Sequence, residues 1–238
     1  SSNLGLLHLS ILLILANLAV IYFFDLETSR TVRMGSCLGL FVYVLVTRGF
    51  HKSILLLGLF LMLARDATVL AYELPVFRTL SLVCTILVYG TIGFFIFKRL
   101  PTFKIDLRMM WFTIAIIVLN VFNVYYLSDI IIPVLDNDVQ LFLFFIQSAV
   151  MLFMGFFAFL YNETYDGKQS LILLLSVFAF IFSDLSGLAA YFFGYEPAYY
   201  AERVFYLIAA ALLVDYLIHF SPVEDQLSEL NSNELSTE

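Results

Sequence analysis

The chain has 238 residues, of which 62% are hydrophobic and only 13% are charged, and its mean hydropathy is +0.97. A soluble domain cannot bury so much apolar surface, so this composition indicates an integral membrane protein. The net charge of −7 gives no reason to expect a nucleic-acid partner, because such partners select basic surfaces.

Long, continuous apolar runs divide the chain into eight expected membrane helices. About 20 apolar residues, rising about 1.5 Å each, cross a bilayer, and runs of roughly that length recur with short connections. The expected helices are 4–24, 32–47, 53–72, 76–98, 108–129, 138–161, 169–193 and 198–220. The prediction is an all-α, polytopic bundle that forms one domain over 1–220. An acidic tail follows at 221–238, and we expect it to be disordered.

The distribution of Lys and Arg predicts the orientation, since short cytoplasmic loops carry an excess of both. Seven basic residues lie near the connections after the second, fourth and sixth helices: Arg48, Lys52, Lys98, Arg99, Lys104, Arg108 and Lys168. Four lie near the connections after the first, third, fifth and seventh helices: Arg30, Arg33, Arg78 and Arg203. We therefore expect both termini in the cytoplasm and a location in a bacterial inner membrane.

Two aspartates interrupt apolar helices, Asp66 in LMLARDATVLAY and Asp184 in FIFSDLSGLAAY. A carboxylate at membrane depth costs about 2.5–3.5 kcal/mol, so it normally faces the bundle interior and has a function. The expected helix ends place the two acids about 9 Å and about 13 Å below the same membrane surface. A purely structural role, with each carboxylate hydrogen-bonded between helices, is the alternative.

Other polar side chains are expected at a similar depth, where they would line one polar chamber with the two acids. They are Asn17, Thr85, Asn120, Asn123, Gln147, Ser183 and Tyr206. Arg65 has three open roles: it can reach the outer interface, pair with an acid of another helix, or bind a ligand phosphate. We predict that a substrate is bound by Arg65, Asn120, Asn123, Gln147, Ser183 and Tyr206. Glu196, Glu202 and Arg203 are expected to form a solvated rim.

Two carboxylates in a water-poor chamber suit general acid–base hydrolysis, because one can hold a proton while the other stays ionised. The three histidines lie near the predicted cytoplasmic helix ends, so a zinc site or a bis-histidine haem is not indicated. No phosphate-binding glycine loop and no GxSxG motif occurs, and we expect no cofactor. A vinyl ether on a lipid is a fitting substrate, since protonation at carbon followed by addition of water releases an aldehyde.

The segments LMLARDATVLAY and FIFSDLSGLAAYFF, in a bundle that ends in YLIAAALLVDYLI, resemble the YhhN family of lysoplasmalogenases. The resemblance implies a membrane hydrolase that cleaves the vinyl ether bond of lysoplasmalogens, releasing a fatty aldehyde and a glycerophospho-head group. It implies catalytic roles for Asp66 and Asp184 alone. The chain departs from the family pattern at Arg65, where a glycine commonly precedes the first aspartate.

A protein without enzymatic activity is the alternative that the sequence leaves open. The same polar chamber could bind a small lipid or amphiphile, or carry it in a proton-coupled transporter, which would also need buried carboxylates. Transporters often contain helices broken by Gly or Pro, whereas Pro101, Pro133 and Pro222 lie in expected connections or at helix ends.

Overall fold

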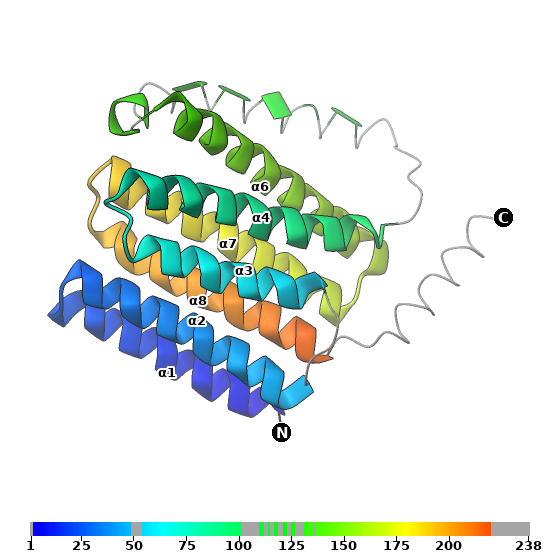
Figure 1. The fold of residues 1–238 in the computed structure, drawn as a ribbon. Coiled ribbons are helices and arrows are strands. Elements are labelled where there is room, and N and C mark those ends of the chain that lie inside the picture. The colour runs from blue at the N-terminus through cyan, green and yellow to red at the C-terminus, as the bar shows by residue number, and fades with distance from the viewer. Residues whose placement is uncertain are drawn as a thin grey trace.

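The computed structural model describes residues 2–48, 54–100, 131–135 and 137–219, with the positions 110–111, 114, 117–118, 121–122 and 125–126 between them. Within these residues the chain forms seven α-helices and no strand (Figure 1). The helices are α1 (Ser2–Phe23), α2 (Leu26–Arg48), α3 (Ile54–Val69), α4 (Pro75–Phe97), α6 (Asp138–Tyr165), α7 (Lys168–Phe192) and α8 (Pro197–His219). A short 3-10 helix, Ile132–Val134, precedes α6.

The predicted all-α membrane architecture is confirmed, but the count of eight helices is not. Five of the described helices are long and apolar enough to cross a membrane: Leu4–Phe23, Leu26–Thr47, Pro75–Phe97, Asp138–Tyr165 and Lys168–Phe192. Helix α3 has only 16 residues, and α8 carries three charged residues within its apolar sequence. Most of the expected helix 108–129 and the whole tail 221–238 lie outside the described residues.

Local sequence signals explain where the helices begin. In the break before α2, the Asp25 Oδ1 atom accepts a hydrogen bond from the Thr28 amide (2.9 Å), which stabilises the free amides of the first turn. Asn137 does the same for α6 through the Gln140 amide. Between α7 and α8, Gly194 has a φ of 64°, a backbone conformation that favours glycine, and Pro197 then opens α8.

Helices α7 and α8 form the centre of the bundle. Helix α8 packs against α7, α1, α2 and α3, whereas α4 packs between α3 and α6 (Figure 1). The connections α1–α2, α3–α4 and α7–α8 lie together at one end of the bundle, on the left in Figure 1. We call this the cavity end. The start of α1 and the finish of α8 lie at the opposite end.

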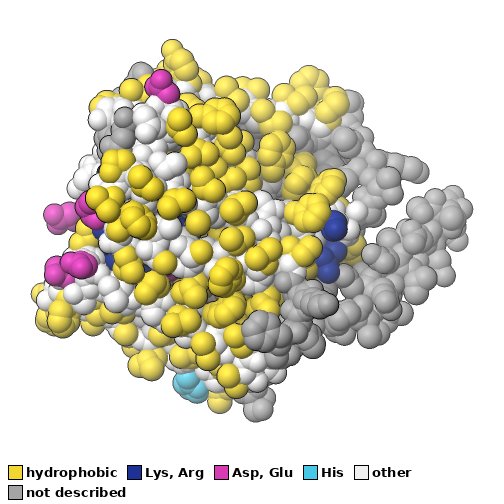
Figure 2. Space-filling model, viewed as in Figure 1, with side chains coloured by type: hydrophobic (Ala, Val, Ile, Leu, Met, Phe, Trp, Pro, Cys, Tyr) yellow, Lys and Arg dark blue, Asp and Glu magenta, His cyan; other side chains and the backbone are white. Residues whose placement is uncertain are grey.

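The surface has the distribution of polarity that a bilayer requires. On the face shown in Figure 2, apolar side chains cover the middle of the molecule. Acidic side chains project at the cavity end, and a group of Lys and Arg side chains lies at the opposite end. Large apolar residues such as Leu12, Leu15 and Val46 are exposed on α1 and α2, as expected for helices that face lipid.

Candidate functional site

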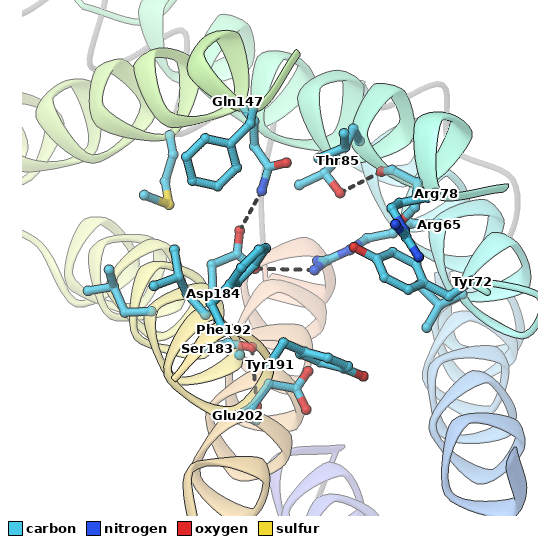
Figure 3. A pocket seen from close by; sticks show the side chains of 18 of the residues that line it. Arg65, Tyr72, Arg78, Thr85, Gln147, Ser183, Asp184, Tyr191, Phe192 and Glu202 are labelled. Carbon is cyan, nitrogen blue, oxygen red and sulfur yellow. Dashed lines mark hydrogen bonds and ion pairs between the residues drawn. The ribbon is translucent and has the colours of Figure 1, made fainter. Parts of the chain in front are cut away.

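A cavity of about 710 Å³ lies at the cavity end, and α2, α3, α4, α6, α7 and α8 all contribute to its wall. Its polar lining includes Asp184 of α7, Arg65 of α3 and Gln147 of α6, which converge on one point in Figure 3. The volume falls within the roughly 300–1,000 Å³ that small-molecule sites usually have. Of the side chains expected in one polar chamber, Asp184, Gln147, Thr85 and Ser183 line this cavity, whereas Asp66, Asn17 and Tyr206 do not.

Asp184 accepts hydrogen bonds from three different helices. The Tyr89 hydroxyl of α4 lies 2.5 Å from Oδ2, and the Gln147 amide nitrogen lies 3.3 Å from the same atom. The Arg65 Nη2 atom lies 3.2 Å from Oδ1. Of the three roles open to Arg65, the structure therefore selects an ion pair with an acid of another helix.

Asp66 has a different environment from Asp184, although the two acids were expected to share a chamber. Its Oδ2 atom accepts a hydrogen bond from the Tyr206 hydroxyl of α8 (2.7 Å), and its Oδ1 lies 3.2 Å from Arg33 Nη2 of α2. Asp66 is buried behind the cavity and does not line it, and neither carboxylate hydrogen-bonds to the other. The two acids therefore do not share a proton directly, because each is paired with a separate arginine.

The ion pair of Asp66 continues into a buried charge network that the sequence did not predict. Arg33 also donates to Glu202 Oε1 (2.9 Å), and the Glu202 Oε2 atom lies 3.4 Å from Arg203 Nε. Arg203 in turn donates to the side-chain oxygen of Asn17 (3.0 Å). The expected solvated rim is thus wrong for Glu202 and Arg203, which are both buried.

The buried charge network arises because the helices begin at other residues than the sequence predicted. Helix α2 begins at Leu26, six residues before the expected start at 32. Arg30 therefore lies within the helix and not before it, and Arg33 lies about two turns from the helix start and not at its end. Both arginines are buried, and α8 brings Glu202 and Arg203 against the same face of α2. Opposite charges on packed helices can then neutralise one another inside the bundle.

The remaining predicted residues divide into three groups. Gln147 binds Asp184 and lines the cavity, as the prediction of a substrate-binding role requires. Ser183 also lines the cavity, but its hydroxyl donates to the Glu202 carbonyl oxygen (3.1 Å). The Tyr206 hydroxyl donates to Asp66, and Tyr206 does not line the cavity. Asn120 and Asn123 lie outside the described residues.

Two important residues were missed by the sequence analysis, Tyr89 and Arg33. Tyr89 is fully buried in the apolar α4, and a buried tyrosine hydroxyl normally needs a hydrogen-bond partner, which is a signal that sequence can provide. Arg33 was expected at the very start of the helix 32–47 and was counted with the charges near the preceding connection. Because α2 begins six residues earlier, Arg33 lies inside the helix on a buried face.

The cavity lining at the boundary with water includes Arg30 and Glu73, which form an ion pair (2.5 Å), and the aromatic ring of Tyr72. The Arg30 and Arg78 guanidinium carbons lie 5.9 Å and 5.3 Å from the centre of that ring. The hydrogen bond from Arg30 holds the pKa of Glu73 below the ordinary range of a glutamate. The Glu73 side chain is 68% exposed, so this pair lies at the boundary with water.

The Arg30–Glu73 pair predicts a small dependence of stability on pH. Because the pKa of folded Glu73 is lowered, the pair stabilises the fold fully above about pH 4.3, the ordinary glutamate pKa, and less as the pH falls through the lowered value. We expect Glu73→Gln to reduce the free energy of unfolding by under about 1 kcal/mol at pH 7, since the Glu73 side chain is 68% exposed and water screens its charge. Detergent-phase unfolding at several pH values measures this. A difference that grows towards acid pH would contradict it.

Comparisons with protein-family models, with curated proteins and with solved structures find no match to this chain. The resemblance to the YhhN family therefore stays a prediction from short motifs.

Proposed function

We propose that this protein is a membrane-embedded hydrolase of a lysophospholipid vinyl ether, with Asp184 as the group that moves protons at the substrate. The observation that carries the proposal is a carboxylate on the wall of a cavity of about 710 Å³, held by hydrogen bonds from Tyr89, Gln147 and Arg65. Residues of three further helices orient it, which is the preorganisation that acid–base catalysis needs.

The cavity lining combines the two chemistries of a lysophospholipid. Its cationic side chains are Arg30, Arg33, Arg65 and Arg78, and Figure 3 places Arg65 and Arg78 on one side of Asp184. Its apolar lining includes Leu82, Met151, Leu152, Leu185, Leu188 and Phe192. Arginine binds phosphate through its fork of N–H donors, while the apolar wall suits a single hydrocarbon chain. An anionic head group and one chain would thus both find complementary surfaces.

Buried polar atoms without a hydrogen-bond partner in the cavity wall favour the binding of a polar ligand. The Nε atoms of Arg33 and Arg65 and the Oε1 atom of Gln147 are buried and have no partner among the described residues. Buried polar atoms are normally satisfied, so such atoms commonly serve a bound molecule. The arginine nitrogens would donate to phosphate oxygens, and the Gln147 oxygen would accept from the free hydroxyl of a lysophospholipid glycerol.

The reaction needs one proton to be given and one to be taken back. A protonated Asp184 donates to the vinyl carbon that is distal to the ether oxygen, and the adjacent carbon becomes an oxocarbenium ion. Water then attacks that carbon and returns a proton to the carboxylate. The hemiacetal then breaks its bond to the glycerol oxygen: its hydroxyl loses a proton as the C=O bond forms, and the glycerol oxygen takes up a proton. The products are a fatty aldehyde and the glycerophospho-alcohol.

Asp66 contributes in this scheme as a positioning residue. It holds Arg33 and the Tyr206 hydroxyl, and Arg33 in turn lines the cavity. The resemblance implied catalytic roles for both aspartates. The contacts favour direct proton transfer by Asp184 and an indirect role for Asp66, since Asp66 has no surface in the cavity.

We further propose a bacterial inner membrane location with both termini in the cytoplasm. The sequence has four basic residues near the connections that are expected on the non-cytoplasmic side. Of these, Arg30, Arg33 and Arg203 are buried in ion pairs, and Arg78 lines the cavity. These four arginines do not act as loop charges, which strengthens the excess of Lys and Arg that the sequence shows near the connections expected on the cytoplasmic side. The cavity would then open toward the outer surface.

The direct test is to incubate the purified protein with a lysoplasmalogen and to assay the release of aldehyde. We expect release that depends on the protein and on the vinyl bond, with no release from the saturated 1-O-alkyl analogue. If the lipid binds but no aldehyde appears, the protein is a lipid binder or transporter and the hydrolase proposal is wrong.

A further inference from the structure

Among the described residues, three ion pairs have both partners in the cavity wall: Arg30–Glu73, Arg33–Glu202 and Arg65–Asp184. In the first of these, Glu73 is 68% exposed and lies at the boundary with water. Arg65 and Asp184 both line the wall, with side chains 13% and 11% exposed. Arg33, by contrast, bridges Asp66 and Glu202, which are nearly inaccessible. A ligand can therefore compete for Arg65, whereas Arg33 is held by two buried acids.

The ion pair with Asp184 uses only part of the hydrogen-bond donor capacity of the Arg65 guanidinium group. Nη2 donates to Asp184 Oδ1 at 3.2 Å, and Nε has no partner. A guanidinium has five N–H donors, and it pairs best with an anion that accepts two of them side by side. A phosphate monoester or diester presents several acceptor oxygens, so it can bind Arg65 better than one carboxylate oxygen does.

On these grounds we propose that the Arg65–Asp184 pair is a switch operated by the phosphate of an anionic amphiphile. The phosphate binds Arg65 and draws it from Asp184, and Asp184 then takes up one proton from water. The inference rests on the proposed function for its use, because it explains how a carboxylate that is paired in the empty cavity becomes an acid when a lipid is bound.

The groups that surround Asp184 support this exchange. From α4 it faces the Tyr89 hydroxyl, from α6 the Gln147 amide, and from α3 Arg65. Arg33 of α2 and Glu202 of α8 also line the cavity, but they are bound to each other. When Arg65 leaves, the remaining direct partners of Asp184 are neutral. An ionised carboxylate without a cation is costly in a water-poor site, and proton uptake removes that cost.

Gln147 can accommodate both states of the carboxylate. Its amide nitrogen now donates to Asp184 Oδ2, and its Oε1 atom has no partner. Rotation of the amide would bring Oε1 towards a protonated Asp184, which then donates to it. The switch thus needs no movement of the backbone.

The experiment measures protons taken up when a lipid binds, using a saturated 1-O-alkyl lysophospholipid that contains no vinyl bond. Titration calorimetry of the full chain in detergent at pH 7, in two buffers with different ionisation enthalpies, gives the number of protons taken up per bound lipid. We expect a value approaching one for the wild type. Asp184→Asn should bind the lipid without proton uptake. Uptake of zero by the wild type, or equal uptake by Asp184→Asn, would overturn the proposal.

Two variants of Arg65 and one control variant separate the switch from a loss of structure. Arg65→Gln should bind the lipid about 10-fold to 100-fold more weakly, as expected for a lost charged hydrogen bond, and should take up no proton. Arg65→Lys keeps the charge and should restore part of the affinity. Asp215→Asn, whose acid pairs with His219 and does not line the cavity, is the matched control and should behave as the wild type. Wild-type affinity in Arg65→Gln would exclude Arg65 as the phosphate ligand.

A last comparison identifies the source of the phosphate. Glycerol 3-phosphate should show the same proton uptake but bind at least about tenfold more weakly, because it lacks the chain that the apolar wall would bury. Equal affinity would exclude a lipid. Proton uptake without aldehyde release in the lysoplasmalogen assay would refute the hydrolase and keep the switch, whereas release without uptake would refute the switch alone.

Discussion

Replacing Asp184 with asparagine is expected to abolish aldehyde release while leaving the protein folded. Asparagine has nearly the same shape and can still accept from Tyr89 and Gln147, but it can neither give nor take the proton of the reaction. General acid–base catalysis contributes about 100-fold to 10,000-fold, so the loss of rate should be at least of this order. The measurements are the aldehyde assay and thermal unfolding of the same detergent preparation.

Asp66→Asn is the matched comparison, since it alters an aspartate that does not line the cavity. It removes charge from the pair with Arg33, so we expect a smaller loss of rate together with lower thermal stability. An equal loss in both variants, with the fold of Asp66→Asn intact, would favour the acid–base pair implied by the family resemblance. Full activity in Asp184→Asn would refute the proposed mechanism.

Replacing Arg33 with methionine is expected to produce the largest loss of stability of any single change in the polar network. Arg33 lies between Asp66 and Glu202, whose side chains are 0% and 8% exposed. Its removal leaves the buried Asp66 without its arginine and Glu202 with Arg203 alone. Breaking a buried pair in this way costs about 3–5 kcal/mol. Since whole domains are stable by only about 5–15 kcal/mol, a large drop in the unfolding temperature should follow.

Arg30→Gln provides the control, because Arg30 lies three residues earlier on the same helix and its partner Glu73 is 68% exposed. Water can solvate Glu73 when Arg30 is lost, so we expect a much smaller effect on the unfolding temperature. The double variant Arg33→Met with Asp66→Asn should recover part of the loss, as the two residues are in contact. Equal destabilisation by Arg33→Met and Arg30→Gln would show that the buried network does not carry the stability.

Much of the architecture follows from the sequence alone. The apolar runs predicted the described helices to within a few residues at most ends, as in α7, expected at 169–193 and found at Lys168–Phe192. An aspartate within such a run had to face inward, and Asp66 and Asp184 both do. These results depend on a local cost, that of exposing a carboxylate or a backbone amide to lipid, which each segment meets independently.

Only the tertiary structure decided which charge pairs with which. Arg33 and Glu202 lie 169 residues apart, and Arg65 and Asp184 lie 119 residues apart. Each residue turns a helix by about 100°, so an error of one residue in a helix start changes the neighbour that a side chain faces. The early start of α2 places Arg30, which was expected in the connection, and Arg33, which was expected at the helix end, on buried positions of the helix. Pairing depends on the rotation of several helices at once, and no single stretch of sequence contains that information.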